Sequence, residues 1–384
     1  MKALIFERSL PRLAAARVAW KAGPLAFTRD AEEPALRGLD WHRVRPRLAG
    51  ICGSDLATVE GRSSRWFEPI VSFPFVPGHE IVGDLDDGTR VVVEPVLACA
   101  ARGIDPVCEA CAEGAIDRCE RLAFGHLKPG LQTGFCTDTG GGWSTALVAH
   151  ESQLHRVPDA MSDEAAVMVE PAACAIHGAV TSGVTGETVV VIGAGTLGLC
   201  TIAALRAYAL PGRLIAAAKH PEQRRLAREL GADTVVETAE LRRAVRRATG
   251  SMALETGLTG GADLVVDCVG TEGTIAEALA LVRPAGTVVL VGMPGRVNID
   301  LTPLWQRQIM LVGAYAYGTE VDVDGRRTFD LAFDLVQEAK LERLVTAVYP
   351  LERFKEAIDH AAAAGRRGAV KIAFDLRDER ERNR

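Results

Sequence analysis

A glycine-rich turn near the middle of the chain restricts its fold more than any other feature. Residues 193–198 read Gly-Ala-Gly-Thr-Leu-Gly, directly after a strand-like run at 188–192 and before a helical pattern that continues to residue 209. A turn of this kind, between a buried strand and a helix, lets a pyrophosphate approach the backbone and the helix N-terminus. It predicts a dinucleotide site formed by Gly193, Gly195, Thr196, Leu197 and Gly198.

Strand and helix patterns alternate after this turn. The strand-like segments lie at residues 214–218, 234–236, 263–268 and 287–292, and helical stretches separate them. Such alternation is typical of a parallel, doubly wound sheet. We therefore expect an α/β fold that contains a Rossmann cofactor domain.

The residues after the second strand of this unit indicate which cofactor it binds. About twenty residues beyond the last glycine, an NAD-binding unit carries an acidic residue for the ribose hydroxyls. This chain has Ala218 there, followed by Lys219, His220 and later Arg224. Basic side chains favour a 2′-phosphate, which an acid would repel. NADP(H) is therefore predicted over NAD(H), the alternative being that these cations form only the solvated face of the next helix.

Three side chains of the metal-ligand type stand in motifs far apart along the chain. Cys52 lies in Gly-Ile-Cys-Gly-Ser-Asp, His79 in Pro-Gly-His-Glu, and Glu170 directly before a proline. One thiolate, one imidazole and one carboxylate form a catalytic zinc set that leaves a fourth position open for water or substrate. We predict a zinc ion at these three residues, with Ser54 beside it.

In this order, the Gly-Ile-Cys-Gly-Ser-Asp motif, the Gly-His-Glu motif, a cysteine cluster and the glycine-rich turn resemble the zinc-dependent medium-chain dehydrogenases, the alcohol and polyol dehydrogenase family. The resemblance covers nearly the whole chain. It implies a β-rich, GroES-like catalytic domain at residues 1–171, completed by 315–384, and an NADP-binding Rossmann domain at 172–314.

The resemblance leaves the third ligand of the catalytic zinc open. Glu80 is either a ligand, as in polyol-type sites, or a carboxylate that orients the neighbouring histidine. Cys174 stands where the family places a small residue facing the nicotinamide, and it would replace Glu170 in a Cys-Cys-His shell. Glu170 is preferred because the Glu-Pro pair looks like that of polyol dehydrogenases.

A second zinc site is implied by a cluster of cysteines. Cys108, Cys111 and Cys119 have the spacing Cys-x2-Cys-x7-Cys, which matches the structural-zinc lobe of the family. Four thiolates form a closed tetrahedral site. The fourth ligand departs from the family pattern, because Asp105 stands at its usual place and Cys99 comes six residues earlier. We predict Cys99 as this ligand, with Asp105 as the alternative, and hence about two zinc ions per chain.

The resemblance also implies a reaction and its remaining site residues. Cofactor contacts outside the glycine-rich turn are expected at Cys174, Val291, Gly292, Met293 and Lys371. Ser54 passes the substrate's hydroxyl proton onward. Many family members have a histidine three residues later, but here Ala57 stands there, so the relay must use the cofactor ribose and water or a residue not identified from sequence.

The predicted function is reversible hydride transfer between NADP(H) and a secondary alcohol or polyol, or the corresponding ketone. One alternative is the same reaction with NAD(H). The other is a non-catalytic NADPH-binding protein on the same fold, which would be expected to have lost its metal ligands. The family also implies a homodimer or homotetramer, in which the strand at 309–315 pairs across a dimer.

Bulk properties exclude several kinds of partner for this chain of 384 residues. Its net charge of −6 leaves no basic footprint for nucleic acid, and no run approaches the roughly 18 apolar residues of a membrane helix. Basic residues interrupt the first twenty positions, which argues against a signal peptide. Nine cysteines, an odd number, indicate thiolate ligands rather than a disulfide framework. We therefore expect a cytoplasmic enzyme that acts on small molecules.

Overall fold

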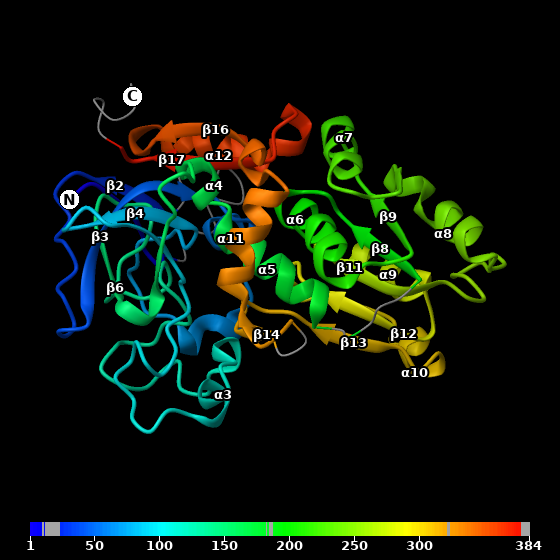
Figure 1. Cartoon of the computed structure of the whole chain (residues 1–384), viewed down its shortest axis with the longest axis horizontal. Coiled ribbons are helices and arrows are strands. Elements are labelled where there is room, and N and C mark those ends of the chain that lie inside the picture. Colours follow the sequence, from blue (N-terminus) through cyan, green and yellow to red (C-terminus); the bar gives the residue numbers. More distant parts are fainter. Residues whose placement is uncertain (10, 12–23, 182, 184–186, 321–322, 378–384) are drawn as a thin grey trace. The chain divides into compact units, whose positions relative to one another are not determined.

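The computed structural model describes residues 1–9, 11, 24–181, 183, 187–320 and 323–377. The chain divides into two compact units (Figure 1). The first holds Met1–Glu170, Glu342–Ala363 and the chain from Lys371 onward, and the second holds Pro171–Leu341 and Ala364–Val370. Within the described residues, every helix is too short or too polar to cross a membrane.

A mixed, mainly antiparallel sheet forms the centre of the first unit. Its strands run in the order β16-β17-β3-β4-β5-β7, and β6 pairs with β3. Their bounds are β3 (Trp41–Gly50), β4 (Ile81–Leu85), β5 (Arg90–Val93), β6 (Leu147–His150), β7 (Leu154–Arg156), β16 (Val345–Pro350) and β17 (Lys371–Asp375). A separate hairpin consists of β1 (Ala3–Phe6) and β2 (Leu25–Thr28).

Alternating side chains of the sheet strands build the core of this unit. Val44, Val91 and Val93 pack with Ile81 and Leu147 in one buried cluster, as expected where one face of an antiparallel sheet turns inward. The short helices are α2 (Gly53–Val59), α3 (Glu109–Ala112), α4 (Asp163–Ala166), α12 (Phe354–Ala362), η2 (Arg65–Ile70), η3 (Ile116–Arg118), η4 (Glu151–Gln153), η7 (Leu341–Leu344) and η8 (Leu351–Arg353).

The second unit is built on a parallel sheet of six strands in the order β10-β9-β8-β11-β12-β13. The strands are β8 (Thr188–Ile192), β9 (Arg213–Ala217), β10 (Thr234–Val236), β11 (Ala262–Asp267), β12 (Val282–Leu290) and β13 (Met310–Gly313). The chain order reverses between β8 and β11, which is the switch point where doubly wound sheets bind ligands. This confirms the predicted doubly wound α/β class.

Helices separate these strands and cover the sheet. They are α5 (Val169–Val180), α6 (Thr196–Ala204) with its continuation η5 (Leu205–Ala209), α7 (Pro221–Glu229), η6 (Thr238–Glu240), α8 (Leu241–Thr249), α9 (Glu272–Leu281), α10 (Thr302–Gln306), α11 (Thr328–Glu338) and η9 (Ala364–Arg367). A two-stranded piece joins β14 (Thr319–Glu320) to β15 (Arg326–Arg327).

The unit boundaries differ from the expected domains in two places. The first boundary lies between Glu170 and Pro171, one residue from the expected position, but residues 315–341 and 364–370 group with the second unit. Contacts within that unit explain the grouping. The Tyr208 hydroxyl donates to the Leu331 carbonyl at 3.0 Å, and His177 Nδ1 lies 2.9 Å from Glu320 Oε1.

Candidate functional site

Strand pairing brings three ligand-type side chains together in the first unit. Cys52 comes two residues after the end of β3, and His79 and Glu80 directly precede β4. Because β3 and β4 are antiparallel, with Ala49 opposite Ile81, the end of one strand meets the start of the other. The ligand atoms of Cys52, His79 and Glu80 all lie within 4.8 Å of one another.

Asp55 holds both Cys52 and His79 in this cluster. Its Oδ2 accepts the backbone N–H of Cys52 at 2.9 Å, and its Oδ1 lies 3.4 Å from Nδ1 of His79. Burial lowers the pKa of His79, but the charge of Asp55 outweighs it and raises that pKa well above its ordinary value. A carboxylate beside one ring nitrogen orients the ring and leaves the other, Nε2, to a metal ion. The sequence analysis did not assign this role to Asp55. Its place three residues after Cys52, in the same motif, was the one feature that could have indicated it.

Glu80 forms a buried ion pair with Lys371. Lys371 opens β17, which pairs with β3 so that Ala373 lies opposite Gly50, and both charged side chains are almost fully buried. A Cβ on Gly50 would lie 1.8 Å from Oε2 of Glu80, so only glycine leaves room for the pair. Lys371 was predicted to contact the cofactor. Here it neutralises Glu80, and the cofactor contact stays a prediction.

Glu170, the predicted third ligand, is not a member of this group. Glu170 is buried and near enough that its negative charge contributes to raising the pKa of Lys371, against the effect of burial, but the group within 4.8 Å contains Glu80 instead. The third ligand therefore stays open between these two carboxylates. Cys174 lies further along α5, and Ser54 lies in the first turn of α2; both are half-buried.

The donor set of this cluster fits a zinc ion. A thiol, an imidazole and a carboxylate converge at a spacing that one ion can span, and soft sulfur with nitrogen and oxygen is the ligand combination of catalytic zinc sites. Nδ1 of His79 and Oδ1 of Asp55 are buried and have no other hydrogen-bond partner among the described residues, so their pairing at 3.4 Å leaves Nε2 as the ring nitrogen for a metal ion.

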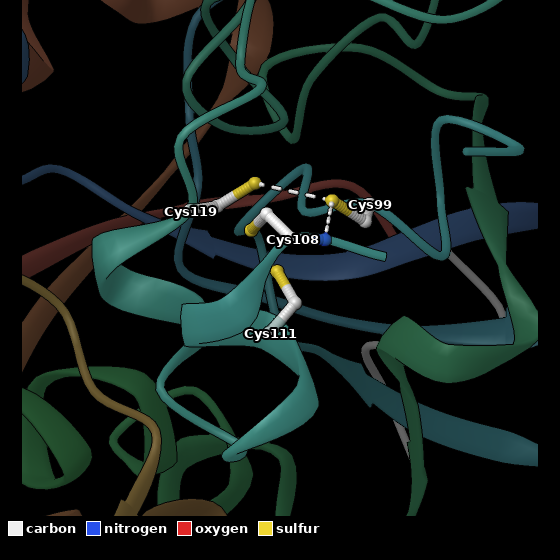
Figure 2. A group of neighbouring side chains, drawn as sticks. All are labelled: Cys99, Cys108, Cys111 and Cys119. Atoms are coloured by element: carbon white, nitrogen blue, oxygen red, sulfur yellow. Dashed lines mark hydrogen bonds between the residues drawn. The ribbon is translucent and has the colours of Figure 1, made fainter. Parts of the chain in front are cut away.

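Four cysteines converge in the lobe that surrounds α3 and η3 (Figure 2). The sulfurs of Cys99 and Cys119 lie 3.7 Å apart, and the backbone N–H of Cys108 donates to the sulfur of Cys99 at 3.4 Å. Burial raises the pKa of Cys108, yet backbone hydrogen bonds lower it to about 7, whereas burial raises the pKa of Cys111 and Cys119. Of these three thiols, Cys108 therefore most readily supplies the thiolate that a metal requires. Cys99, and not Asp105, completes the group with Cys108, Cys111 and Cys119.

Arg102 organises the loop that brings Cys99 to the other cysteines. Its fully buried guanidinium donates to backbone carbonyls, which are those of Leu97, Phe124, Leu127, Lys128 and Gly130. Burial lowers the pKa of Arg102, while negative charge on nearby cysteines, Cys119 and Cys99 among them, opposes that effect. Arg102 is therefore a buried cation beside a site that is anionic when its thiols ionise. Sequence reasoning gave it no role, because a single arginine in a loop carries no motif.

The glycine-rich turn of the second unit has the geometry that a pyrophosphate requires. Gly193 has φ +89°, a conformation that favours glycine. A Cβ on Gly195, the N-cap of α6, would meet nothing within 4 Å, whereas a Cβ on Gly198 would lie 1.8 Å from the Gly193 carbonyl oxygen. The three glycines thus provide a tight turn, an open approach and close helix packing. Thr196 and Leu197 follow in the first turn of α6.

Most of the other predicted cofactor residues of this unit follow the carboxyl ends of two strands. Val291 and Gly292 follow β12, and both donate their N–H groups to the Asp267 carbonyl at the end of β11; Met293 comes next. The second group comes after β9 and comprises Lys219, His220 and Arg224. Arg224 donates to the carbonyls of Ala218 and Lys219 and pairs with Glu237 at 2.9 Å. Its guanidinium therefore shapes the turn after β9.

The cysteine lobe yields a direct test of the fourth ligand. Cys99→Ser should lower the zinc content of the purified protein by about one ion per chain, because a hydroxyl is a far weaker zinc ligand than a thiolate. Asp105→Asn should keep the full zinc content. Metal analysis by mass spectrometry measures both variants. Loss of zinc from the Asp105 variant alone would make Asp105 the ligand.

Arg102→Met should destabilise the cysteine lobe by about 3 kcal/mol, because several buried carbonyls lose their partner. The measurement is the urea concentration at which a chelating dye captures the zinc of the lobe, which should fall. Arg121→Met is the matched control, since Arg121 lies in the same lobe with its side chain exposed. Equal midpoints for the two variants would contradict the role of Arg102.

Two protein-family models match the chain and together span most of it. The alcohol dehydrogenase GroES-like domain matches residues 38–159, and the zinc-binding dehydrogenase domain matches residues 196–338. The first match lies in the β-rich unit with the Cys52 cluster, and the second contains most of the parallel sheet. The GroES-like part of the predicted fold is thereby confirmed.

Characterised relatives align over most of both sequences. L-idonate 5-dehydrogenase from Vitis vinifera is 28% identical, with 87% of each chain covered. Sorbitol dehydrogenase from Arabidopsis thaliana is 29% identical, covering 87% of this chain and 88% of its own. A putative zinc-binding dehydrogenase from Sinorhizobium meliloti, solved bound to NADP, superposes with a TM-score of 0.73 at 25% identity, covering 97% of this chain and 98% of its own. The chain belongs to the zinc-dependent medium-chain dehydrogenases, the alcohol and polyol dehydrogenase family.

Proposed function

We propose that this protein transfers a hydride between NADP(H) and a secondary alcohol or polyol, or the corresponding ketone, at a zinc centre. The observation that carries the proposal is the convergence of Cys52, His79 and a buried carboxylate within 4.8 Å in a chain of this family. The names of the idonate and sorbitol dehydrogenase relatives support polyols as the substrate class.

Residues of the first unit would have different roles at this zinc centre. Cys52 and His79 would hold the ion together with Glu80 or Glu170. A zinc ion bound there supplies a Lewis acid that polarises the substrate oxygen and lowers the pKa of an alcohol. Asp55 keeps the imidazole of His79 in one orientation, and Lys371 balances the charge of Glu80.

Ser54 is the proposed proton acceptor for the substrate hydroxyl. It lies in the first turn of α2, two residues after the predicted zinc ligand Cys52. Ala57, where many relatives have a histidine, is buried and cannot carry a proton. The hydroxyl of Thr58 already donates to the Ser54 carbonyl at 2.8 Å, which fixes the helical turn that presents Ser54.

The preference for NADP(H) rests on the end of β9. Ala218 is buried there and Lys219 is exposed. Because residue 218 is an alanine, this position has no carboxylate that would repel a 2′-phosphate. The binding of NADP by the Sinorhizobium meliloti structure is compatible with this choice.

Assembly and location complete the proposal. β13 forms one edge of the parallel sheet, and Met310 and Leu311 on it are exposed by 52% and 39%. An exposed apolar edge strand favours pairing with another chain, which supports a homodimer or homotetramer. We further propose that the enzyme acts in the cytoplasm on small alcohols or ketones, without a nucleic-acid or membrane partner.

Turnover tests the central claim. The zinc-loaded enzyme should oxidise members of a polyol panel with NADP⁺, and Ser54→Ala should lower kcat by about 10²- to 10⁴-fold, as expected for loss of a proton-transfer group. Nicotinamide absorbance measures both. Ser63→Ala is the control, because its hydroxyl lies after α2 and bonds Thr58. Full turnover by the Ser54 variant would remove its role, and no turnover of any alcohol with either cofactor would refute the function.

Ala218→Asp tests the cofactor preference. The added carboxylate should repel the 2′-phosphate, and the ratio of kcat/KM for NADPH over NADH should fall by about tenfold or more. Ala218→Asn, which has nearly the same shape without the charge, should leave the ratio within about twofold. An unchanged ratio in the Asp variant would contradict the argument from the missing acid.

A further inference from the structure

A short segment from near the C-terminus lies against the dinucleotide-binding side of the second unit. Residues Ala364–Val370 belong to this unit although the chain on both sides belongs to the first. The hydroxyl of Thr196, in the first turn of α6, donates to the Val370 carbonyl at 3.4 Å. One end of the segment is therefore held at the glycine-rich turn.

The other end of the segment packs against the start of α7. A Cβ on Gly365 would lie 2.3 Å from Cδ2 of His220 and 3.0 Å from Nε2 of Gln223, so the backbone of η9 touches the imidazole directly. Figure 1 shows α7 with the loop that follows α12 beside it. His220 is the N-cap of α7, and it follows the position where cofactor choice is decided. Residues 364–370 thus connect the pyrophosphate turn to the ribose end of the predicted cofactor site.

The segment brings two arginines to this place. Arg366 and Arg367 directly follow Gly365, and both are exposed. Lys219 directly precedes His220 and is also exposed. In the part of the chain that the structure describes, none of these three cations forms an ion pair. All three follow or precede, by one or two residues, the contact between Gly365 and His220, and their charges are available to a ligand.

Arg224 stands in contrast to these three cations. Its guanidinium is bound to two backbone carbonyls and to Glu237, so its charge is already balanced. The nearby Glu222 is likewise paired, with Arg225. Any anion that approaches the turn after β9 would meet the positive charge of Lys219 and the two arginines, together with the N-terminal end of α7.

We propose that Arg366 and Arg367 act with Lys219 to bind the 2′-phosphate of NADP(H). The selectivity of this enzyme then depends on residues 364–370 as well as on the turn after β9. The inference rests on the NADP(H) preference proposed above. An arginine guanidinium suits the task, because its fork of donors matches the oxygens of a phosphate, and Arg224 serves to hold the turn in shape.

Binding of two adenosine nucleotides to the full-length protein tests this proposal without turnover. Adenosine 2′,5′-bisphosphate carries the phosphate in question, and adenosine 5′-monophosphate lacks it. In isothermal titration calorimetry, the double variant Arg366→Gln/Arg367→Gln should weaken binding of the bisphosphate by about tenfold or more, as expected for lost hydrogen bonds to a charged group. Binding of the monophosphate should change by less than about twofold.

Controls separate a local from a general effect. Arg247→Gln removes an exposed arginine from α8 in the same unit and should change neither affinity. Lys219→Gln should weaken only the bisphosphate. The single variants Arg366→Gln and Arg367→Gln assign the effect to one or both arginines, and Arg366→Lys/Arg367→Lys should recover part of the affinity. Thermal unfolding confirms that each variant is folded.

Two different failures are distinguishable in this experiment. If the unchanged protein binds the bisphosphate no more tightly than the monophosphate, the NADP(H) preference itself is wrong, and the role of the arginines falls with it. If the unchanged protein prefers the bisphosphate but the double variant keeps that preference, the preference stands and the contribution of residues 364–370 is overturned.

Discussion

Strand β3, held between β4 and β17, is the constraint on which the candidate zinc centre depends. Gly50 donates its N–H to the Glu80 carbonyl, and Ile51 donates to the Ile372 carbonyl. These bonds bring Cys52, the His79-Glu80 pair and Lys371 to one end of the sheet. A one-residue slip in either pairing would turn these side chains to the opposite face. The register of these strands therefore determines the geometry of the site.

The charges of this centre are compatible with a buried location because each has a partner. Lys371 and Glu80 are both almost fully buried, and an isolated charge there would cost several kcal/mol. Asp55 is buried beside His79. The same holds in the cysteine lobe, where the buried Arg102 donates to backbone carbonyls and lies near Cys119 and Cys99. Paired polar groups, rather than apolar packing alone, hold both metal-type clusters in position.

The parallel sheet of the second unit positions the residues predicted to bind the dinucleotide. It leads a glycine-rich turn, the end of β9 and the end of β12 to the carboxyl side of the strands, where doubly wound folds bind cofactors. Residues 364–370 then return to this unit, and Val370 contacts the first turn of α6. A segment remote in sequence from the glycine-rich turn thereby becomes part of its surroundings.

Local sequence determined the elements whose signal lies within a few residues. The Gly-x-Gly-x-x-Gly turn, the strands of the parallel sheet and the spacing of Cys108, Cys111 and Cys119 were readable because turn geometry and strand patterns depend on near neighbours. Tertiary structure alone decided that Glu80 lies in the group with Cys52 and His79, that Lys371 neutralises it, that Arg102 supports the cysteine lobe and that Gly365 packs on His220. Those contacts join residues that are distant along the chain, and their partners are set by strand register and loop path, which no local pattern of residues encodes.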